Sequence, residues 1–132
     1  MVRLPHRSMR ILLDTHILLW WLADDRRLPD PVRTAVADGN NAVYVSAISV
    51  AEIAIKGSLG KLESPGDLAA AVERCGLSHL PFTAEHADRL STLPWHHRDP
   101  LDRMLIARAM VESMTFASVD PACRSYDVRL FS

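Results

Sequence analysis

This sequence lacks the features that mark several large classes of protein. Its 132 residues contain no apolar run near the ~20 residues that a membrane-spanning helix needs. The first eight residues, MVRLPHRS, contain no apolar signal core and no cleavage site, so we expect a cytoplasmic protein with no membrane partner. The two cysteines, Cys75 and Cys123, have neither metal-ligand spacing nor a disulfide-framework pattern. We expect both to be buried thiols.

The sequence also lacks repeats, linkers and a strong charge of either sign. Its formal net charge is −1, so no global basic field predicts nucleic-acid binding. The hydrophobic fraction of 48% and the charged fraction of 23% are ordinary for a soluble globular protein. We therefore expect one domain over residues 9–132, preceded by a flexible extension over residues 1–8.

Apolar strand-like runs alternate with helical patterns along the chain. Residues 11–13 predict a strand buried on both faces, and the six apolar residues 17–22 predict the helix after it. Further strands are expected at 42–46, 77–80, 115–119 and 128–131, with helices between them. Such alternation is typical of a parallel sheet with helices on both faces. The predicted fold is an α/β domain of three layers, α/β/α, with a central, mainly parallel sheet.

Four acids lie where predicted strands end or where the next helices begin. Asp14 and Asp120 follow strands directly, whereas Glu52 and Asp102 lie near the starts of helices. The carboxyl ends of parallel strands meet at one edge of the sheet, where open α/β folds bind ligands. We therefore expect the four carboxylates to converge. By helical spacing Glu52 shares a face with Ile48 and Ile55, and Asp102 with Leu105, Ile106 and Ala109.

Each acid also has a simpler explanation as part of a helix cap. An N-cap is predicted at Asp14, Asp99 and Asp120. The segment from Ser49 to Glu52 fits a capping box. The segment 64–67 fits one too, although it faces no sheet edge. Taken singly, an acid of this kind is more often a cap than a catalyst. Convergence favours a metal site instead, because carboxylates without lysines between them repel each other and a divalent cation removes that repulsion. Oxygen ligands select Mg²⁺ or Mn²⁺.

The motifs ILLDTHILLWW, SAISVAEIAIK, HRDPLDRMLIARA, ASVDPACRSY and VRLF, taken together, resemble the PIN-domain ribonucleases. The closest likeness is to the toxin component of VapBC toxin–antitoxin pairs, and it covers residues 9–131. The resemblance places the family's acidic quartet on Asp14, Glu52, Asp102 and Asp120. It places further supporting residues on Asp99, an extra acid that is a possible metal ligand, on Ser118, and on Thr15 of the DTH signature.

This resemblance implies an endoribonuclease that depends on Mg²⁺ or Mn²⁺ and is neutralised by a small VapB-like antitoxin. Arg98 and Arg103 are candidates for stabilising charge on the phosphoryl group, whereas the adjacent His96 and His97 are expected at the surface. Two alternatives remain open. One is a phosphatase or receiver protein using a strand-end Asp, although position 16 is His and only leucines precede Asp14. The other is a non-catalytic interaction domain.

A partner-binding surface is predicted on the first helix. Trp20 and Trp21 are neighbours, so they point about 100° apart and cannot both face one core stripe. We expect one to lie in the core and the other to form, with Leu18 and Leu22, an exposed patch for a partner. The surplus of apolar residues on this helix also predicts a homodimer.

Overall fold

A computed structural model describes residues 8–63 and 66–131, and its centre is a five-stranded sheet. Every paired strand runs parallel to its neighbour, in the order β3-β2-β1-β4-β5, so that β1 is the middle strand. The predicted α/β architecture is therefore confirmed. The strands are β1 (Arg10–Leu13), β2 (Ala42–Ser46), β3 (Ser78–Leu80), β4 (Thr115–Ala117) and β5 (Leu130–Phe131).

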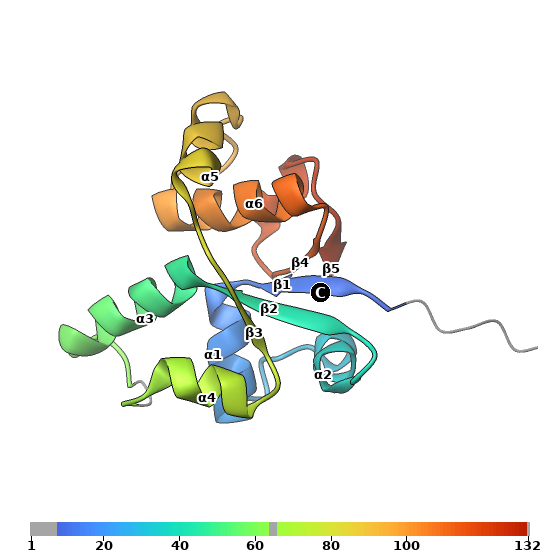
Figure 1. Cartoon of the computed structure of the whole chain (residues 1–132), viewed down its shortest axis with the longest axis vertical. Helices are drawn as coiled ribbons and strands as arrows, with labels where there is room; N and C mark the ends of the chain where they lie inside the picture. Colours follow the sequence, from blue (N-terminus) through green and yellow to red (C-terminus); the bar gives the residue numbers. More distant parts are fainter. Residues whose placement is uncertain (1–7, 64–65, 132) are drawn as a thin grey trace, which may run out of the picture.

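Helices cover both faces of the sheet (Figure 1). One face carries α1 (Thr15–Ala23), α2 (Asp30–Ala37) and α4 (Leu68–Arg74), and the other carries α6 (Pro100–Glu112). The short helices α5 (Ala84–Asp88) and η1 (Arg89–Thr92) pack on α6, and η2 (Pro121–Ser125) follows β4. Helix α3 (Ala47–Ser58) projects from the end of β2 and contacts both α1 and α6. No helix in the two described ranges is both long and apolar enough to cross a bilayer.

The middle strand is apolar throughout because both of its faces are covered. Ile11 and Leu13 belong to the core on the side of α1, whereas Leu12 belongs to the core on the side of α6. All three side chains are at most 1% exposed. This alternation with a period of two residues is the geometry of a strand, and here each face has its own helical layer.

The capping assignments are confirmed at some helices and wrong at others. Asp99 caps α6 with its side chain, as predicted, and Thr83 caps α5 in the same way. Helix α3 begins at Ala47, earlier than predicted, because Ser46 ends β2 and its Oγ accepts the amide of Ile48. The capping box assigned to Ser49 is therefore wrong. Helix α2 begins at Asp30, with Pro29 at the N-cap.

The predicted extension over residues 1–8 lies outside the described residues except at position 8, and the segment 64–65 lies outside them too. The prediction of two buried thiols is wrong for Cys75, which is exposed, while Cys123 is buried. Trp20 and Trp21 also differ from expectation, since both are half-buried and pack at the border of the core on the side of α1. Leu18, predicted to join an exposed patch with one of them, is instead fully buried. The Arg27 guanidinium lies 5.2 Å from the Trp20 ring centroid and covers part of that ring.

Candidate active site

Asp14 stands at the carboxyl end of the middle strand, where the sheet turns into α1. It is only 5% exposed, and its Oδ2 accepts a 2.7 Å hydrogen bond from Ser118 Oγ. Asp14 occupies the N-cap position of α1, as predicted, but its side chain makes no capping hydrogen bond, so capping does not explain this carboxylate. The other oxygen, Oδ1, is buried without a hydrogen-bond partner. Burial raises the pKa of this carboxyl above its usual value, although the bond from Ser118 opposes that shift.

Glu52 reaches the same edge of the sheet from the second turn of α3. Its side chain is buried, Oε2 accepts a 2.7 Å hydrogen bond from Lys56 Nζ, and Oε1 has no partner. The expectation of an acid cluster without lysines is therefore wrong, because Lys56 binds one of the acids. The prediction that Glu52 shares a buried face with Ile55 is also wrong, since Ile55 is 57% exposed. Glu52 is buried next to Ile53, which is buried too.

Thr15 supports this corner indirectly. Its Oγ1 lies 2.9 Å from Ser49 Oγ, and both hydroxyls are buried. Because Thr15 begins α1 and Ser49 lies in the first turn of α3, this bond joins the helices that follow β1 and β2. It thereby helps to fix the helix that carries Glu52 relative to Asp14.

The two acids at the start of α6 have different environments. Asp99 is exposed, and its Oδ1 accepts the amides of Leu101 and Asp102 at 2.9 and 3.2 Å, as a cap should. Asp102 is half-buried and lies on the predicted face with Leu105, Ile106 and Ala109, which are fully buried. Burial, followed by the charges of Asp14, Asp99 and Glu52, raises the pKa of Asp102 to about 6. Asp102 is thus electrostatically part of the acid cluster.

Asp120 joins the cluster through His97, which is predicted at the surface but is half-buried in the structure. Nε2 of His97 lies 2.7 Å from Asp120 Oδ2 and 3.0 Å from Asp102 Oδ2, and its Nδ1 accepts the amide of Asp99. Asp120 also accepts the amide of Ala122 at the start of η2, so it is a cap as well. Partial burial acts to raise the pKa of Asp120. The hydrogen bonds from the Ala122 amide and from His97 outweigh it and hold this pKa below its usual value. The signal for His97 was its place inside the HRDPLDR motif.

The assembled residues fit a divalent cation. One ligand atom each from His97, Asp102 and Asp120 lies within 4.8 Å of the others, a spacing that one ion could bridge. Two buried carboxylate oxygens nearby, on Asp14 and Glu52, have no partner, although buried polar atoms in proteins are nearly always satisfied. Hard carboxylate oxygens are the donors that Mg²⁺ and Mn²⁺ prefer.

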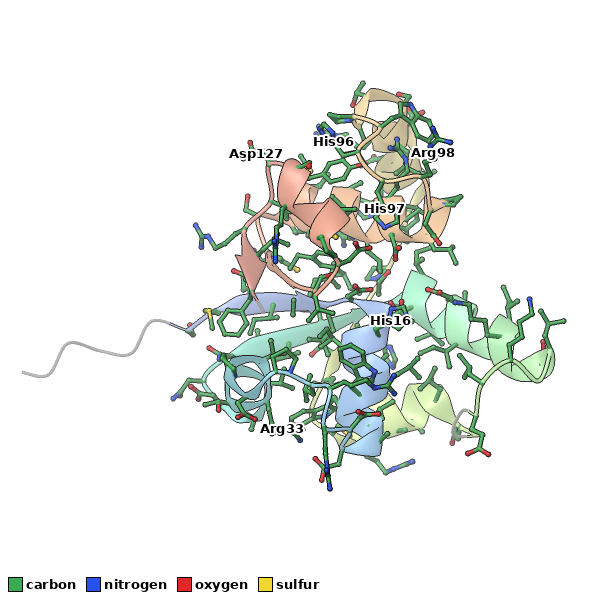
Figure 2. The ribbon with its side chains drawn as sticks, turned by 180° about the vertical axis from the view of Figure 1, so that it is seen from behind. His16, Arg33, His96, His97, Arg98 and Asp127 are labelled. Atoms are coloured by element: carbon green, nitrogen blue, oxygen red, sulfur yellow. The ribbon has the colours of Figure 1, made fainter. Side chains whose placement is uncertain are left out.

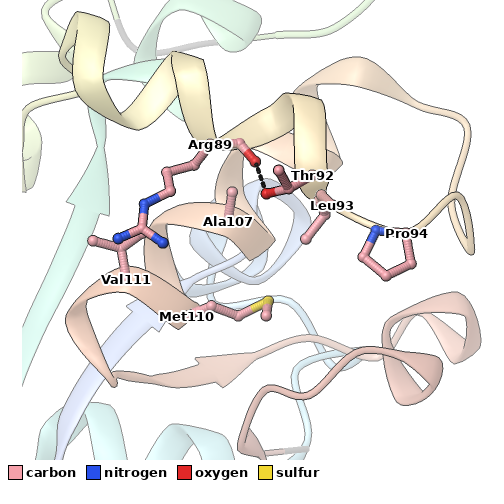
Figure 3. Close-up of a pocket in the computed structure, with 7 residues that line it drawn as sticks. All are labelled: Arg89, Thr92, Leu93, Pro94, Ala107, Met110 and Val111. Atoms are coloured by element: carbon pink, nitrogen blue, oxygen red, sulfur yellow. Dashed lines mark hydrogen bonds between the residues drawn. The ribbon is translucent and has the colours of Figure 1, made fainter.

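The two candidate arginines lie outside this cluster. Arg103 is buried and donates to backbone carbonyls, including those of Pro94 and Leu93, so it is not free to bind a phosphoryl group. Arg98 is exposed and, with His96, lies on the outer part of the loop, while His97 lies nearer the sheet (Figure 2). The pocket in Figure 3, about 220 Å³ in volume, lies between η1 and the later turns of α6. None of its seven lining residues is an acid, so it is separate from the acid cluster.

Comparison with known proteins identifies the family. The family model of the PIN domain matches residues 11–128. No curated protein matches the chain. Among solved structures, VapBC2 from Rickettsia felis bound to a promoter DNA fragment matches with a TM-score of 0.68 and 17% identity, covering 93% of this chain and 98% of that chain.

Two further structures share the fold at low identity. DNA-bound VapBC from Salmonella typhimurium gives a TM-score of 0.69 at 16% identity, covering 94% of this chain and 98% of that one. FitAcB from Neisseria gonorrhoeae gives 0.60 at 24% identity, covering 92% and 96%. Since the family model spans most of the chain, including strands β2, β3 and β4 and the acids Asp14, Glu52, Asp102 and Asp120, this chain belongs to the PIN domain family.

Proposed function

We propose that this chain is a divalent-metal-dependent endoribonuclease that acts in the cytoplasm as the toxin of a toxin–antitoxin pair, with residues 9–132 as its single domain. The observation that carries the proposal is the pair of buried, unpartnered carboxylate oxygens on Asp14 and Glu52 beside the cluster of Asp102, Asp120 and His97. Leaving a buried charge partly unsatisfied costs stability, so its retention favours a role in binding. Membership of a family of nucleases supports the same conclusion.

Asp14, Glu52, Asp102 and Asp120 would hold the ion, with Asp99 near enough to act on Asp102 by charge alone. A bound Mg²⁺ or Mn²⁺ supplies a Lewis acid for the scissile phosphate and lowers the pKa of an attacking water. Ser118 holds Asp14 through Oδ2 and leaves Oδ1 without a partner. Lys56 and His97 occupy carboxylate oxygens in the metal-free protein, and they reduce the repulsion among the acids there.

The proposal is tested with purified protein and a panel of single-stranded RNAs. We expect cleavage with Mg²⁺ or Mn²⁺, and none with a chelator. Restored cleavage on adding back the metal is the control against loss of folding. If the protein hydrolyses a phosphomonoester but no RNA, the phosphatase alternative is correct instead. If it binds protein partners but has neither activity, it is a non-catalytic interaction domain.

A protein partner is part of this proposal. Two of the structures that share the fold are VapBC assemblies, and a small VapB-like antitoxin is the corresponding partner here. The half-buried Trp20 and Trp21 on α1 are the proposed contact for the antitoxin or for a second copy in a homodimer. An arginine from the antitoxin would suit the carboxylate cluster.

Replacing either tryptophan tests this surface. Trp20→Ala or Trp21→Ala should weaken one of the two contacts by about 2 kcal/mol or more, as tryptophans at the centre of interfaces do. Light scattering measures the oligomer, and calorimetric titration measures antitoxin affinity. A monomer at high concentration would refute the homodimer, and undiminished antitoxin affinity in both variants would refute the patch.

A further inference from the structure

The most exposed large apolar side chain in the described part of the molecule is Trp95, in the loop that leads into α6. It is 75% exposed, whereas the other two tryptophans are half-buried. Its indole is not loosely placed, because the Arg103 guanidinium lies 3.7 Å from the ring centroid and covers one face. With one face on Arg103 and three-quarters of the residue exposed, the opposite face is open to solvent.

The support beneath this ring is rigid. Arg103 is 4% exposed, and its nitrogens donate to the carbonyls of Leu90, Leu93 and Pro94. The buried Tyr126 hydroxyl donates to Pro94 and accepts the amide of His97, so both sides of Trp95 are fixed in the loop. A ring held in one orientation before binding loses little conformational entropy when a ligand stacks on it.

The loop that carries the ring also carries His97, which contacts the acid cluster. Trp95 precedes His97 by two residues, so their Cα atoms are at most about 7 Å apart, and His97 contacts both Asp102 and Asp120. A hollow of about 330 Å³ adjoins the ring, and its lining contains Arg98 and Arg103 but no carboxylate. Arg98 is exposed and makes no ion pair within residues 8–63 and 66–131.

We propose that Trp95 is a stacking platform for one nucleobase of single-stranded RNA, with Arg98 beside it for a backbone phosphate, and that it positions the strand for cleavage at the neighbouring acids. This inference rests on the proposed ribonuclease function and extends it to the recognition of substrate. Single-stranded RNA is bound by base stacking on aromatic side chains combined with cationic contacts to phosphates. An apolar protein segment would instead favour a groove without charge at its centre.

The test measures binding rather than cleavage, so that the platform and the ribonuclease activity can fail separately. The parent protein is the full chain carrying Asp14→Asn, titrated in Mg²⁺ with a uridine dodecamer while tryptophan fluorescence is recorded. We expect the dodecamer to quench the emission of Trp95. Adding Trp95→Ala should remove the quenching and weaken binding about tenfold, the range for loss of one stacked base.

Three controls make the result specific to the ring. Trp95→Phe should keep affinity within about threefold, whereas Trp95→Leu, apolar but without a ring, should bind as weakly as the alanine variant. Leu59→Ala removes another exposed apolar side chain, 61% exposed at the end of α3, and should bind like the parent. An abasic dodecamer should bind the parent and Trp95→Ala equally, because it has no base to stack.

The proposal is overturned if Trp95→Ala binds the uridine dodecamer as tightly as the parent, or if it loses the abasic strand to the same extent. Either result would favour a protein partner as the ligand of Trp95. The antitoxin affinity of Trp95→Ala would then measure that contact. Ring-dependent binding in a protein whose wild type cleaves no RNA would support the platform and reject the nuclease. RNA cleavage by a wild-type protein whose binding does not depend on Trp95 would support the nuclease and reject the platform.

Discussion

Asp102 and Arg103 are neighbours on α6, but their surroundings differ. The hydrogen-bonding groups around Arg103 are satisfied, whereas those around Asp102 are not. The buried Arg103 guanidinium is satisfied by backbone carbonyls, by Tyr126 and by the face of Trp95. The acids that surround Asp102 are not satisfied, since Asp14 and Glu52 each keep a buried oxygen without a partner. A buried charge that is fully bonded fixes a loop, whereas a buried charge left incomplete is suited to bind something from outside.

The largest expected effect comes from the acid cluster around Asp102, in which buried oxygens have no partner. Asp14→Asn should reduce metal-dependent RNA cleavage by at least about a thousandfold, because it removes the charge that a divalent ion requires. The fold should remain, since the substitution is isosteric and Asp14 makes no capping bond. Asp67→Asn is the matched control, being an exposed acid at the start of α4. Cleavage by Asp14→Asn at the wild-type rate would show that the metal site is assigned wrongly.

Substitution of Arg103, whose hydrogen bonds are satisfied, should change the stability of the fold. Arg103→Ala is expected to lower the free energy of unfolding by at least about 3 kcal/mol, because it leaves several buried carbonyls without a donor. Chemical denaturation measures this loss. Arg98→Ala replaces an exposed arginine in the loop before α6, and it should change stability by no more than about 0.5 kcal/mol. Equal effects of the two substitutions would remove the basis of the comparison.

Asp102 should be a source of instability in the metal-free protein. Its pKa is about 6 in the folded state and 3.8 in the unfolded reference, so the folded protein holds this proton more tightly. Stability should therefore fall as pH rises from about 4 to about 6, by up to about 3 kcal/mol, and the loss should be complete above that window.

Asp102→Ala removes this proton-linked loss. In a chelator, thermal melts across pH 3–7 should show a shallower decline for Asp102→Ala than for wild type, together with lost cleavage activity. Added Mg²⁺ should stabilise the wild type but have little effect on the variant. A decline as steep as that of the wild type would mean that Asp102 is not the titrating acid.

The smallest expected effect belongs to Asp99. Its carboxylate caps α6 through the amides of Leu101 and Asp102, so Asp99→Ala should cost about 1 kcal/mol and leave much of the activity. Melting and cleavage assays on the Asp99 and Asp102 variants together decide their roles. If Asp99→Ala is the inactive and stable variant, the two assignments are reversed.

Much of the acid cluster could be predicted because the chain encodes it locally. Asp14 follows a strand of consecutive apolar residues, and Asp102 lies three and four residues from Leu105 and Ile106 on a helix. The roles of Asp99 and Thr83 as caps follow from neighbours two or three residues away. Glu52 is predicted near the start of its helix, and it lies in the second turn because that helix begins at Ala47; the capping box, its alternative explanation, is absent.

What the sequence alone determined, then, is the order of strands and helices, the covering of both sheet faces, and the acids that follow the strands. These depend on periodicity and capping, which act over a few residues. Only the tertiary structure decided that His97 bridges Asp102 and Asp120 and that Trp95 rests on Arg103. It also decided that Cys75 is exposed and that both Trp20 and Trp21 are half-buried. These outcomes depend on contacts between elements distant in sequence, or on how a loop folds back, and local pattern does not specify either.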